Sequence, residues 1–297
     1  MTSSEPENHI VTTALNGRGA KLRSLIREST IPIPGAPWAL AAKLAERSGF
    51  EAVYLSGAAL SAGIFAVPDT GIVTLEQCIE HTRLIAEAVS IPVVVDADTG
   101  FGGPREVEEC VRRLEAAGAA AIQIEDQRFP KRCGHLAGKE LIEQAEMSEK
   151  ILAAMRGRSD PHTVIIARTD ARGVTSLDDA ITRSNAYVAS GADWIFVEAL
   201  SSRDEFARVG REIDAPLVAN MTEFGVGPLL TIEELAQRRF AAVLYPVTFL
   251  RLAMKALEAG MAVLLDEGSQ ESMLDLMQSR AELYDLLGYD PSQPPIP

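Results

Sequence analysis

The chain has 297 residues, of which 47% are hydrophobic, and its 28 Lys and Arg against 42 Asp and Glu give a net charge of −14. This acidity argues against nucleic acid or an anionic membrane surface as the main partner. No apolar run approaches the roughly 20 residues that span a bilayer, and the N-terminal residues lack the pattern of a signal peptide. We therefore expect a cytoplasmic protein whose three cysteines stay reduced.

The first half of the chain alternates predicted strands and helices. A tail is expected over residues 1–11, followed by a helix from about 12 to 29 whose leucines recur near helical spacing. Short apolar, β-branched runs then predict strands at 31–34, 52–57, 93–98 and 121–126. The segments between and after them predict helices at 38–47, about 74–89, about 104–117 and a fourth that ends near 155.

The second half repeats this alternation. Strands are predicted at 163–170, 194–199, 216–221 and 241–246, with helices at 177–189, 204–213, 231–239 and 248–265. A further helix is expected at 273–287, and residues 290–297 are rich in proline and predict a loose tail. Eight buried strands, each followed by a helix, indicate a (β/α)8 TIM barrel, and we expect a single domain over residues 1–297.

Polar residues recur where the predicted strands end. In such barrels the catalytic groups come from the C-terminal ends of several strands. One polar strand end could simply reach solvent or cap a helix, but this pattern extends over six strands. It predicts one mouth that carries Ser56, Asp96, Asp98, Glu125, Arg168, Glu198 and Asn220.

Carboxylates at this mouth predict a metal site. Asp96 and Asp98 are two residues apart in a strand, so they project the same way, and their charges repel unless a cation joins them. With Glu125 and Asp69 they offer the oxygen ligands that Mg²⁺ prefers. Two alternatives stay open, because Asp98 could cap the turn at residues 99–100 and Asp69 could belong to a turn at residues 68–71.

Cys133 differs from the other two thiols. Cys78 and Cys110 lie in predicted helices, where a buried, inert cysteine is expected. Cys133 lies in a loop beside Lys131 and Arg132, and positive neighbours favour a thiolate that can exchange a proton near neutral pH. His135, two residues on, is a candidate catalytic residue or a structural hydrogen-bonding partner.

Several motifs together resemble the isocitrate lyase and phosphoenolpyruvate mutase superfamily, most closely its methylisocitrate lyases. The resemblance covers about residues 20–289, and the cysteine loop is its most specific part. The motifs are YLSG at 54–57, VDADTGFG at 95–102, IEDQ at 124–127, KRCGH at 131–135, ARTDA at 167–171, ANMTEFG at 219–225 and LYP at 244–246.

The resemblance implies a (β/α)8 barrel whose last helix is exchanged between the subunits of a homotetramer. It implies that Asp96 binds Mg²⁺ directly, or Mn²⁺, while Asp69, Asp98 and Glu125 hold metal-bound waters, and that Cys133 is the general acid. A di- or tricarboxylate substrate would be bound by residues matching Ser56, Gly57, Ala58, Cys133, Gly134, Arg168, Glu198, Asn220, Thr222, Arg251 and Arg280.

The implied reaction is cleavage of methylisocitrate to pyruvate and succinate, as in propionate catabolism by the methylcitrate cycle. The residue that removes the hydroxyl proton is not assigned, since Tyr54 could serve as this base or could simply pack inside the barrel. Two departures from the family pattern, Ala58-Ala59 and the start of the first barrel helix at residues 35–39, leave the exact di- or tricarboxylate open, with dimethylmalate lyase as the nearest alternative. A carboxyphosphonoenolpyruvate phosphonomutase type is a further alternative, which shares the cysteine loop but, by the family pattern, not the arginine that matches Arg251.

Two other classes fit the sequence less well. A phosphosugar isomerase or aldolase would need glycine-rich phosphate loops after strands seven and eight, where this chain has Asn220 to Glu223 and Tyr245 to Thr248. A silent metal-binding barrel would have no use for Cys133 in a cationic loop.

Overall fold

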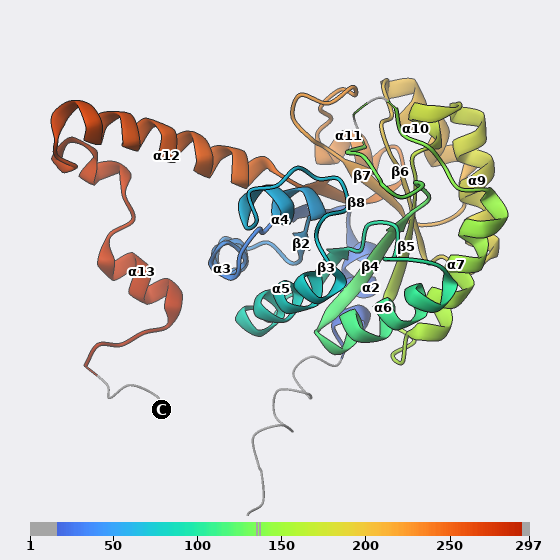
Figure 1. The fold of residues 1–297 in the computed structure, drawn as a ribbon, viewed down its shortest axis with the longest axis horizontal. Helices are drawn as coiled ribbons and strands as arrows, with labels where there is room; N and C mark the ends of the chain where they lie inside the picture. Colours follow the sequence, from blue (N-terminus) through green and yellow to red (C-terminus); the bar gives the residue numbers. More distant parts are fainter. Residues whose placement is uncertain (1–16, 135, 137, 293–297) are drawn as a thin grey trace, which may run out of the picture.

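The computed structural model describes residues 17–134, 136 and 138–292. Eight strands form one parallel sheet in the order β1-β8-β7-β6-β5-β4-β3-β2 (Figure 1). A parallel bridge between Gly35 and Tyr54 joins the two ends of the sheet into a barrel. The predicted TIM barrel is therefore confirmed, with strands at Ile31–Pro34 (β1), Val53–Leu55 (β2), Val93–Asp96 (β3), Ala119–Glu125 (β4), Val164–Thr169 (β5), Trp194–Val197 (β6), Leu217–Asn220 (β7) and Phe240–Tyr245 (β8).

Helices cover the outside of the barrel, and local capping sets where several of them begin. Thr74 and Thr231 each form a capping box with the residue three positions on. Two short helices that the sequence did not predict, α4 (Gly57–Gly63) and α8 (Ala171–Val174), follow β2 and β5. The other outer helices are α3 (Ala39–Arg47), α5 (Leu75–Ala88), α6 (Pro104–Ala116), α7 (Gln144–Gly157), α9 (Leu177–Ala189), α10 (Arg203–Glu212) and α11 (Ile232–Ala236).

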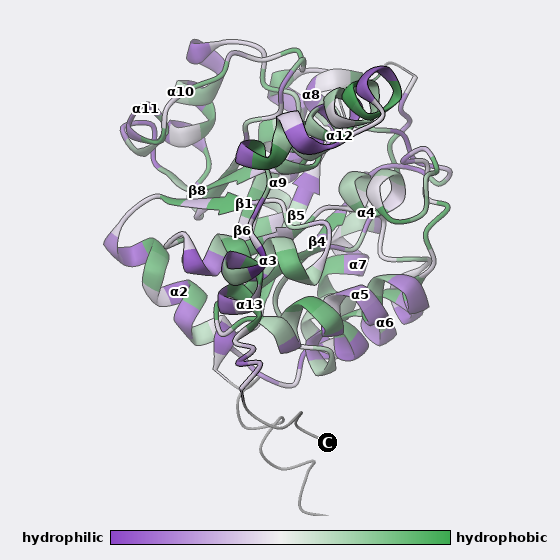
Figure 2. Ribbon diagram, turned by 90° about the vertical axis from the view of Figure 1, so that its left-hand side faces the viewer, coloured by the Kyte–Doolittle hydropathy of each residue, from purple (hydrophilic) through white to green (hydrophobic). Residues whose placement is uncertain are grey.

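Alternate residues of the strands build two apolar clusters. One fills the barrel interior and includes Ile33, Val94 and Phe196. The other lies between strands and helices, where Val95 and Ile122 are fully buried, and the hydrophilic residues of α5 and α6 face the outside of the molecule (Figure 2). This two-layer burial explains why the strands read as nearly continuous apolar runs. Within the described ranges, no helix is both long and apolar enough to cross a membrane.

Helix α2 (Arg18–Glu28) closes one end of the barrel. Its Leu22 is buried in the interior cluster, and Leu25 and Ile26 pack against that cluster. The Arg18 guanidinium donates to backbone carbonyls at the end of α5, at 2.8 and 2.6 Å, so α2 is fixed where the strands begin. The opposite end, where the strands finish, is the mouth.

After β8 the chain leaves the barrel. Helix α12 (Thr248–Glu267) extends away from the strands (Figure 1), and Leu250 is its one buried residue. The continuous helix predicted over 273–287 is wrong, because Glu271–Leu276 is a 3-10 helix (η1) and α13 (Arg280–Leu287) begins anew. The cause is a capping box, in which Ser279 and Glu282 each accept the other's backbone N–H. The predicted tails lie outside the described residues, apart from 290–292.

Candidate active site

The polar residues at the strand ends face the inside of the barrel mouth. In β4, Ile122 and Ile124 belong to the outer cluster, so Gln123 and Glu125 point inward. The same alternation turns Arg168 inward at the end of β5, after Ile166 in the interior cluster. Gln123, Glu125 and Arg168 are all buried. The strand ends that the sequence singled out therefore form the top layer of the barrel interior.

Backbone and side-chain donors fix the carboxylate of Asp96 at the end of β3. Its Oδ2 accepts the N–H of Gly57 at 3.1 Å, and its Oδ1 accepts from Asp98 N–H at 3.1 Å and the Gln123 amide at 3.2 Å. Gly57 opens α4, and Ser56 caps that helix with its hydroxyl oxygen. The turn after β2 thus orients the carboxylate that ends β3.

The ammonium group of Lys131 lies among the predicted metal carboxylates. It pairs with Asp98 at 2.6 Å and also with Asp69. Burial lowers the pKa of Lys131, but the charges of Glu125, Asp98, Asp69 and Asp96 together outweigh it and hold that pKa above its ordinary value. Burial also raises the pKa of the Asp98 carboxyl to about 6, against the opposing effect of Lys131. Four carboxylates here face one ammonium group.

This carboxylate set fits a hard divalent cation in its chemistry. Burial raises the pKa of Glu125 well above its ordinary value, and its buried Oε1 has no hydrogen-bond partner in the part of the chain described. Such an oxygen beside other carboxylates offers what Mg²⁺ prefers. Over the described residues no group of three or more His, Cys, Asp and Glu is arranged as a metal site. The ammonium group of Lys131 lies among the carboxylates instead.

Arg168 is shared between three carboxylates. Its Nε lies 2.9 Å from Asp170 Oδ2 and 3.3 Å from Glu125 Oε2, and its terminal nitrogen lies 3.1 Å from Glu198 Oε2. Burial lowers the pKa of Arg168, but these carboxylates outweigh burial and raise it. Asn220 donates to Glu198 Oε1 at 3.2 Å, which continues the polar ring to β7. Arg168 is thus a fixed positive charge at the mouth.

Side chains on both sides hold the loop that carries Cys133. The Gln127 amide donates to Arg132 C=O and accepts from Arg132 N–H, both at 2.9 Å. On the other side, Lys139 donates to the carbonyl of Gly134. The thiol is therefore flanked by two side-chain-to-backbone anchors, one before it and one after it.

Gly134 lets this loop approach the strand ends closely. A β carbon at Gly134 would overlap the Arg168 guanidinium and the Glu198 side chain, so glycine is required for this contact. Cys133, its neighbour, is half-buried. The predicted His135 lies outside the described residues. The loop thus places Gly134, the residue after Cys133, beside the predicted substrate contacts Arg168 and Glu198.

The remaining thiols agree with the prediction that they are inert. Cys78 and Cys110 are buried. Burial raises the pKa of Cys78 well above its ordinary value and that of Cys110 to about 12. Because the thiolate is the reactive form, neither thiol is poised for chemistry at neutral pH.

Tyr54 lies below the carboxylates, inside the barrel. Its hydroxyl donates to Gln123 Oε1 at 3.1 Å, and Gln123 in turn donates to Asp96. Burial, followed by the charge of Asp96, raises the pKa of Tyr54 well above its ordinary value. The phenol stays protonated in this arrangement, which favours the packing alternative over the role of base.

The structure brings only some of the other predicted substrate residues to the mouth. Ala58 is the second residue of α4, and Thr222 lines a small pocket after β6 and β7. Arg251, on α12, reaches the rim of the mouth through Glu223, with 3.6 Å between Arg251 Nε and Glu223 Oε2. Arg280 begins α13, which contacts α3 on the outer wall (Figure 1), so the structure does not bring it to this mouth.

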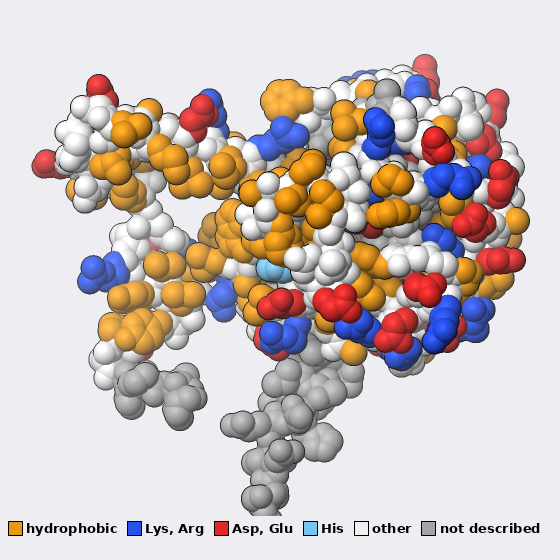
Figure 3. All heavy atoms as spheres, in the orientation of Figure 1, with side chains coloured by type: hydrophobic (Ala, Val, Ile, Leu, Met, Phe, Trp, Pro, Cys, Tyr) orange, Lys and Arg blue, Asp and Glu red, His pale blue; other side chains and the backbone are white. Residues whose placement is uncertain are grey.

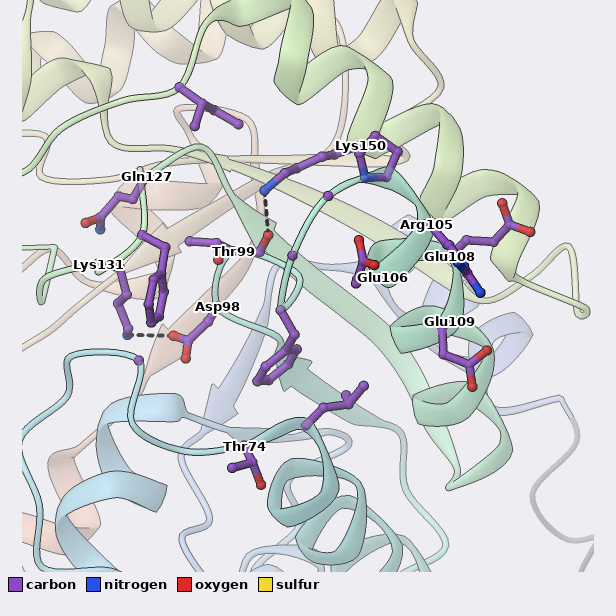
Figure 4. A pocket seen from close by; sticks show the side chains of 18 of the residues that line it. Thr74, Asp98, Thr99, Arg105, Glu106, Glu108, Glu109, Gln127, Lys131 and Lys150 are labelled. Carbon is purple, nitrogen blue, oxygen red and sulfur yellow. Dashed lines mark hydrogen bonds and ion pairs between the residues drawn. The ribbon is translucent and has the colours of Figure 1, made fainter.

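A pocket opens beside the mouth, between α6, α7 and the segment that precedes α5. Figure 4 shows Lys131 and Asp98 pointing toward each other at one side of it. Lys150 from α7 reaches in and donates to Thr99 C=O at 3.0 Å. The Lys131–Asp98 ion pair therefore forms the wall of the pocket on the side of the carboxylates.

Sequence reasoning missed the side chains that hold the site together. Asp170 and Gln123 each lie two residues from a predicted site residue, so strand periodicity could have placed them on the same side. Lys139 and Gln127 lie at the two ends of an irregular loop. No periodicity could have predicted their partners.

Comparisons with known proteins agree on one family. The model of the phosphoenolpyruvate phosphomutase family matches residues 22–265. The chain is 49% identical over 272 residues to 2-methylisocitrate lyase from Aeropyrum pernix, covering 91% of this chain and 87% of the relative. It is 47% identical over 271 residues to 2-methylisocitrate lyase from Halalkalibacterium halodurans, covering 91% and 89%.

Solved structures with the same fold are similar over nearly the whole chain. A 2,3-dimethylmalate lyase is 33% identical with a TM-score of 0.85, covering 93% of this chain and 91% of its own. A phosphonopyruvate hydrolase in complex with oxalate and Mg²⁺ is 33% identical with a TM-score of 0.83, covering 91% and 95%.

Proposed function

The chain belongs to the phosphoenolpyruvate phosphomutase family, as its motifs predicted, and we propose that it is a carbon–carbon lyase that cleaves 2-methylisocitrate to pyruvate and succinate. Relatives named 2-methylisocitrate lyase are 41–49% identical to this chain. The observation in the structure that supports the proposal most is the position of the cysteine loop. Gly134 approaches Arg168 and Glu198 while Lys131 reaches Asp98, so Cys133 lies in the chain between a residue beside the guanidinium and a residue beside the carboxylates.

The divalent cation is part of this proposal. Asp96 would hold Mg²⁺ or Mn²⁺, with Asp69, Asp98 and Glu125 around it, because hard cations prefer oxygen ligands and Glu125 Oε1 has no hydrogen-bond partner among the described residues. When bound, the cation supplies Lewis-acid stabilisation of negative charge on the substrate oxygens.

The chain's own residues orient the substrate and supply a proton. Arg168 would pair with a substrate carboxylate, assisted by donors of Ser56 and Asn220. A base takes the hydroxyl proton as the carbon–carbon bond breaks, which leaves pyruvate and a carbanion beside a carboxylate. Cys133 would then protonate that carbanion from its thiol, giving succinate and a thiolate that regains a proton from the site or solvent.

Measurement of 2-oxoacid release tests this function, as pyruvate from 2-methylisocitrate or 2,3-dimethylmalate and as glyoxylate from isocitrate. Purified protein is given 2-methylisocitrate, isocitrate or 2,3-dimethylmalate, with Mg²⁺ or with a chelator. We expect turnover that needs the metal and is fastest with 2-methylisocitrate. If none of the three acids is cleaved in the presence of Mg²⁺, the lyase function is wrong.

A 2,3-dimethylmalate lyase is the second candidate, because a solved enzyme of that name has the same fold at 33% identity. The two substrates differ in carboxylates, since methylisocitrate carries three and dimethylmalate two. Arg251 at the rim would contact the additional carboxylate. A preference for dimethylmalate in the pyruvate assay would decide for the second candidate.

The exposed apolar face of α12 supports assembly with further copies of the chain, as a homotetramer. Hydrophobic side chains run along the helix (Figure 3), and Leu252, Met254, Leu257, Met261 and Leu265 are between 51% and 89% exposed. Because a helix with this much exposed apolar surface gains free energy by burial, we propose that it packs on a neighbouring subunit in exchange for that subunit's helix.

Analytical ultracentrifugation tests the assembly. The wild-type protein is expected to sediment as a tetramer, and Leu257→Glu on the exposed face of α12 is expected to shift it to smaller species. Leu152→Glu, at a site that is 49% exposed on α7, is a matched control that should leave the assembly unchanged. A monomeric wild-type protein would contradict the proposal.

A further inference from the structure

One buried carboxylate joins the cysteine loop to the substrate-binding arginine. Asp170 is fully buried after β5. It accepts from Arg168 Nε at 2.9 Å and a terminal Arg168 nitrogen at 3.2 Å, and it also accepts from Lys139 Nζ at 2.7 Å. The same Lys139 ammonium donates to Gly134 C=O, the residue after Cys133. A continuous chain of contacts thus runs from the loop to the guanidinium.

Buried hydrogen bonds to Asp126 hold Asp170 in place. The backbone N–H of Asp170 donates to Asp126 Oδ1 at 2.9 Å, and Asp126 Oδ2 accepts from the hydroxyls of Thr169 and Tyr187 at 2.7 and 2.8 Å. All of these groups are buried. Because buried, fully bonded polar groups have few alternative arrangements, Asp170 presents its two oxygens in one orientation.

We propose that Lys139 is a positioning residue that, through Asp170, ties the closed arrangement of the Cys133 loop to the orientation of Arg168. The acid role of Cys133 rests on the proposed function, but the tie between loop and arginine does not. When Lys139 is removed, Gly134 loses its anchor and the thiol leaves the mouth more often. When the Asp170 charge is removed, both Lys139 and Arg168 lose their shared partner.

Alkylation of Cys133 in the substrate-free protein tests directly whether Lys139 holds the Cys133 loop in place. Iodoacetamide is added to native protein, and labelling of each cysteine is followed by mass spectrometry. Cys78 and Cys110 serve as internal controls, because both are buried and would react only if the whole fold loosened. In Lys139→Met we expect Cys133 to react about tenfold faster than in wild type, as for the loss of a hydrogen bond from a charged donor, while the two core thiols stay unlabelled.

A matched variant controls for the loss of a buried cation. Arg18→Met removes a buried guanidinium that also donates to backbone carbonyls, but at the closed end of the barrel. It should leave the Cys133 labelling rate at the wild-type value. An unchanged rate in Lys139→Met, an equal increase in Arg18→Met, or parallel labelling of the core thiols would each overturn the proposal.

A second variant covers the case in which Lys139→Met does not fold. Asp170→Asn keeps the shape but removes the charge that orients both cations, so it should increase Cys133 labelling and also raise KM for the carboxylate substrate. Lys139→Met, by contrast, should lower kcat with little change in KM, because Arg168 keeps Asp170. A wild-type rate of Cys133 labelling in Asp170→Asn would contradict the proposed link between the loop and Arg168. If wild-type protein cleaves none of the tested acids, the proposed function fails while the labelling result still stands.

Discussion

The two halves of the barrel mouth differ in how their charges are balanced. The anionic half, after β2 to β4, sets the carboxylates of Asp69, Asp96, Asp98 and Glu125 against the ammonium group of Lys131, and the only other cation near them is Arg168 of the paired half, 3.3 Å from Glu125, among the described residues. The paired half, after β5 and β6, sets the carboxylates of Asp170 and Glu198 against the cations of Arg168 and Lys139. The anionic half thus carries an excess of negative charge, and the paired half carries none.

This difference assigns separate tasks to the two halves. A divalent cation would relieve repulsion in the anionic half, whereas in the paired half it would compete with bound guanidinium and ammonium groups. An incoming carboxylate would meet no surplus positive charge unless a cation were bound nearby. The cysteine loop contacts both halves, through Lys131 on one side and Gly134 on the other.

The largest expected effect comes from the loop that joins the halves. Cys133→Ala should lower kcat about 10²- to 10⁴-fold, because general acid catalysis contributes about that much. KM should change little. Steady-state pyruvate release measures both constants, and Cys110→Ala, which removes a buried thiol away from the mouth, should retain wild-type kcat. Equal losses in the two variants would show that the effect is not chemical.

The paired half should depend strongly on its own arginine. Arg168→Met leaves three buried carboxylates without their shared cation, so it should lower the free energy of unfolding by about 3–5 kcal/mol. Arg172→Met is the matched control, because its pair with Glu205 is 28% exposed on the arginine side and should cost about 1 kcal/mol or less. Urea unfolding measures both. Similar losses of unfolding free energy in the two variants would contradict this expected difference.

The rim should distinguish substrates by charge. Arg251→Ala is expected to raise KM for 2-methylisocitrate about tenfold, as for the loss of a charged hydrogen bond, and to change KM for 2,3-dimethylmalate less. Stability should be unaffected, since the side chain is half exposed. Equal changes in KM for both acids would show that Arg251 does not contact the additional carboxylate of 2-methylisocitrate.

The smallest effect concerns the core thiols and pH. Burial raises the pKa of Cys110 to about 12 from an ordinary value of 9.0, so between these values the folded protein binds more protons than the unfolded chain. The free energy of unfolding should therefore fall as pH rises through that window. Cys110→Ala should reduce that fall in urea unfolding curves at pH 9 to 11, and an unchanged slope would contradict it.

Strand periodicity predicted most of the fold because both faces of each strand are buried. The same periodicity placed Asp96, Glu125 and Arg168 on one rim. It could not predict the break before α13, which depends on a single capping box at Ser279. The predicted metal and substrate roles of these residues stay predictions.

The loop contacts could not be predicted from the sequence. Lys131 was expected only to favour a thiolate beside it, yet its ammonium group lies among carboxylates distant in the chain. Lys139 and Asp170 are 31 residues apart and meet only because the loop folds back over the mouth. Such pairs depend on tertiary packing and leave no local pattern.

The most direct test of the difference between the halves is a titration with Mn²⁺ followed by electron paramagnetic resonance. It compares wild type with Asp96→Asn in the anionic half and Glu198→Gln in the paired half. We expect wild type to bind Mn²⁺, Asp96→Asn to lose at least about 10- to 100-fold in affinity, and Glu198→Gln to bind like wild type. Absence of binding in wild type, or an equal loss in Glu198→Gln, would contradict the assignment of the cation to the anionic half.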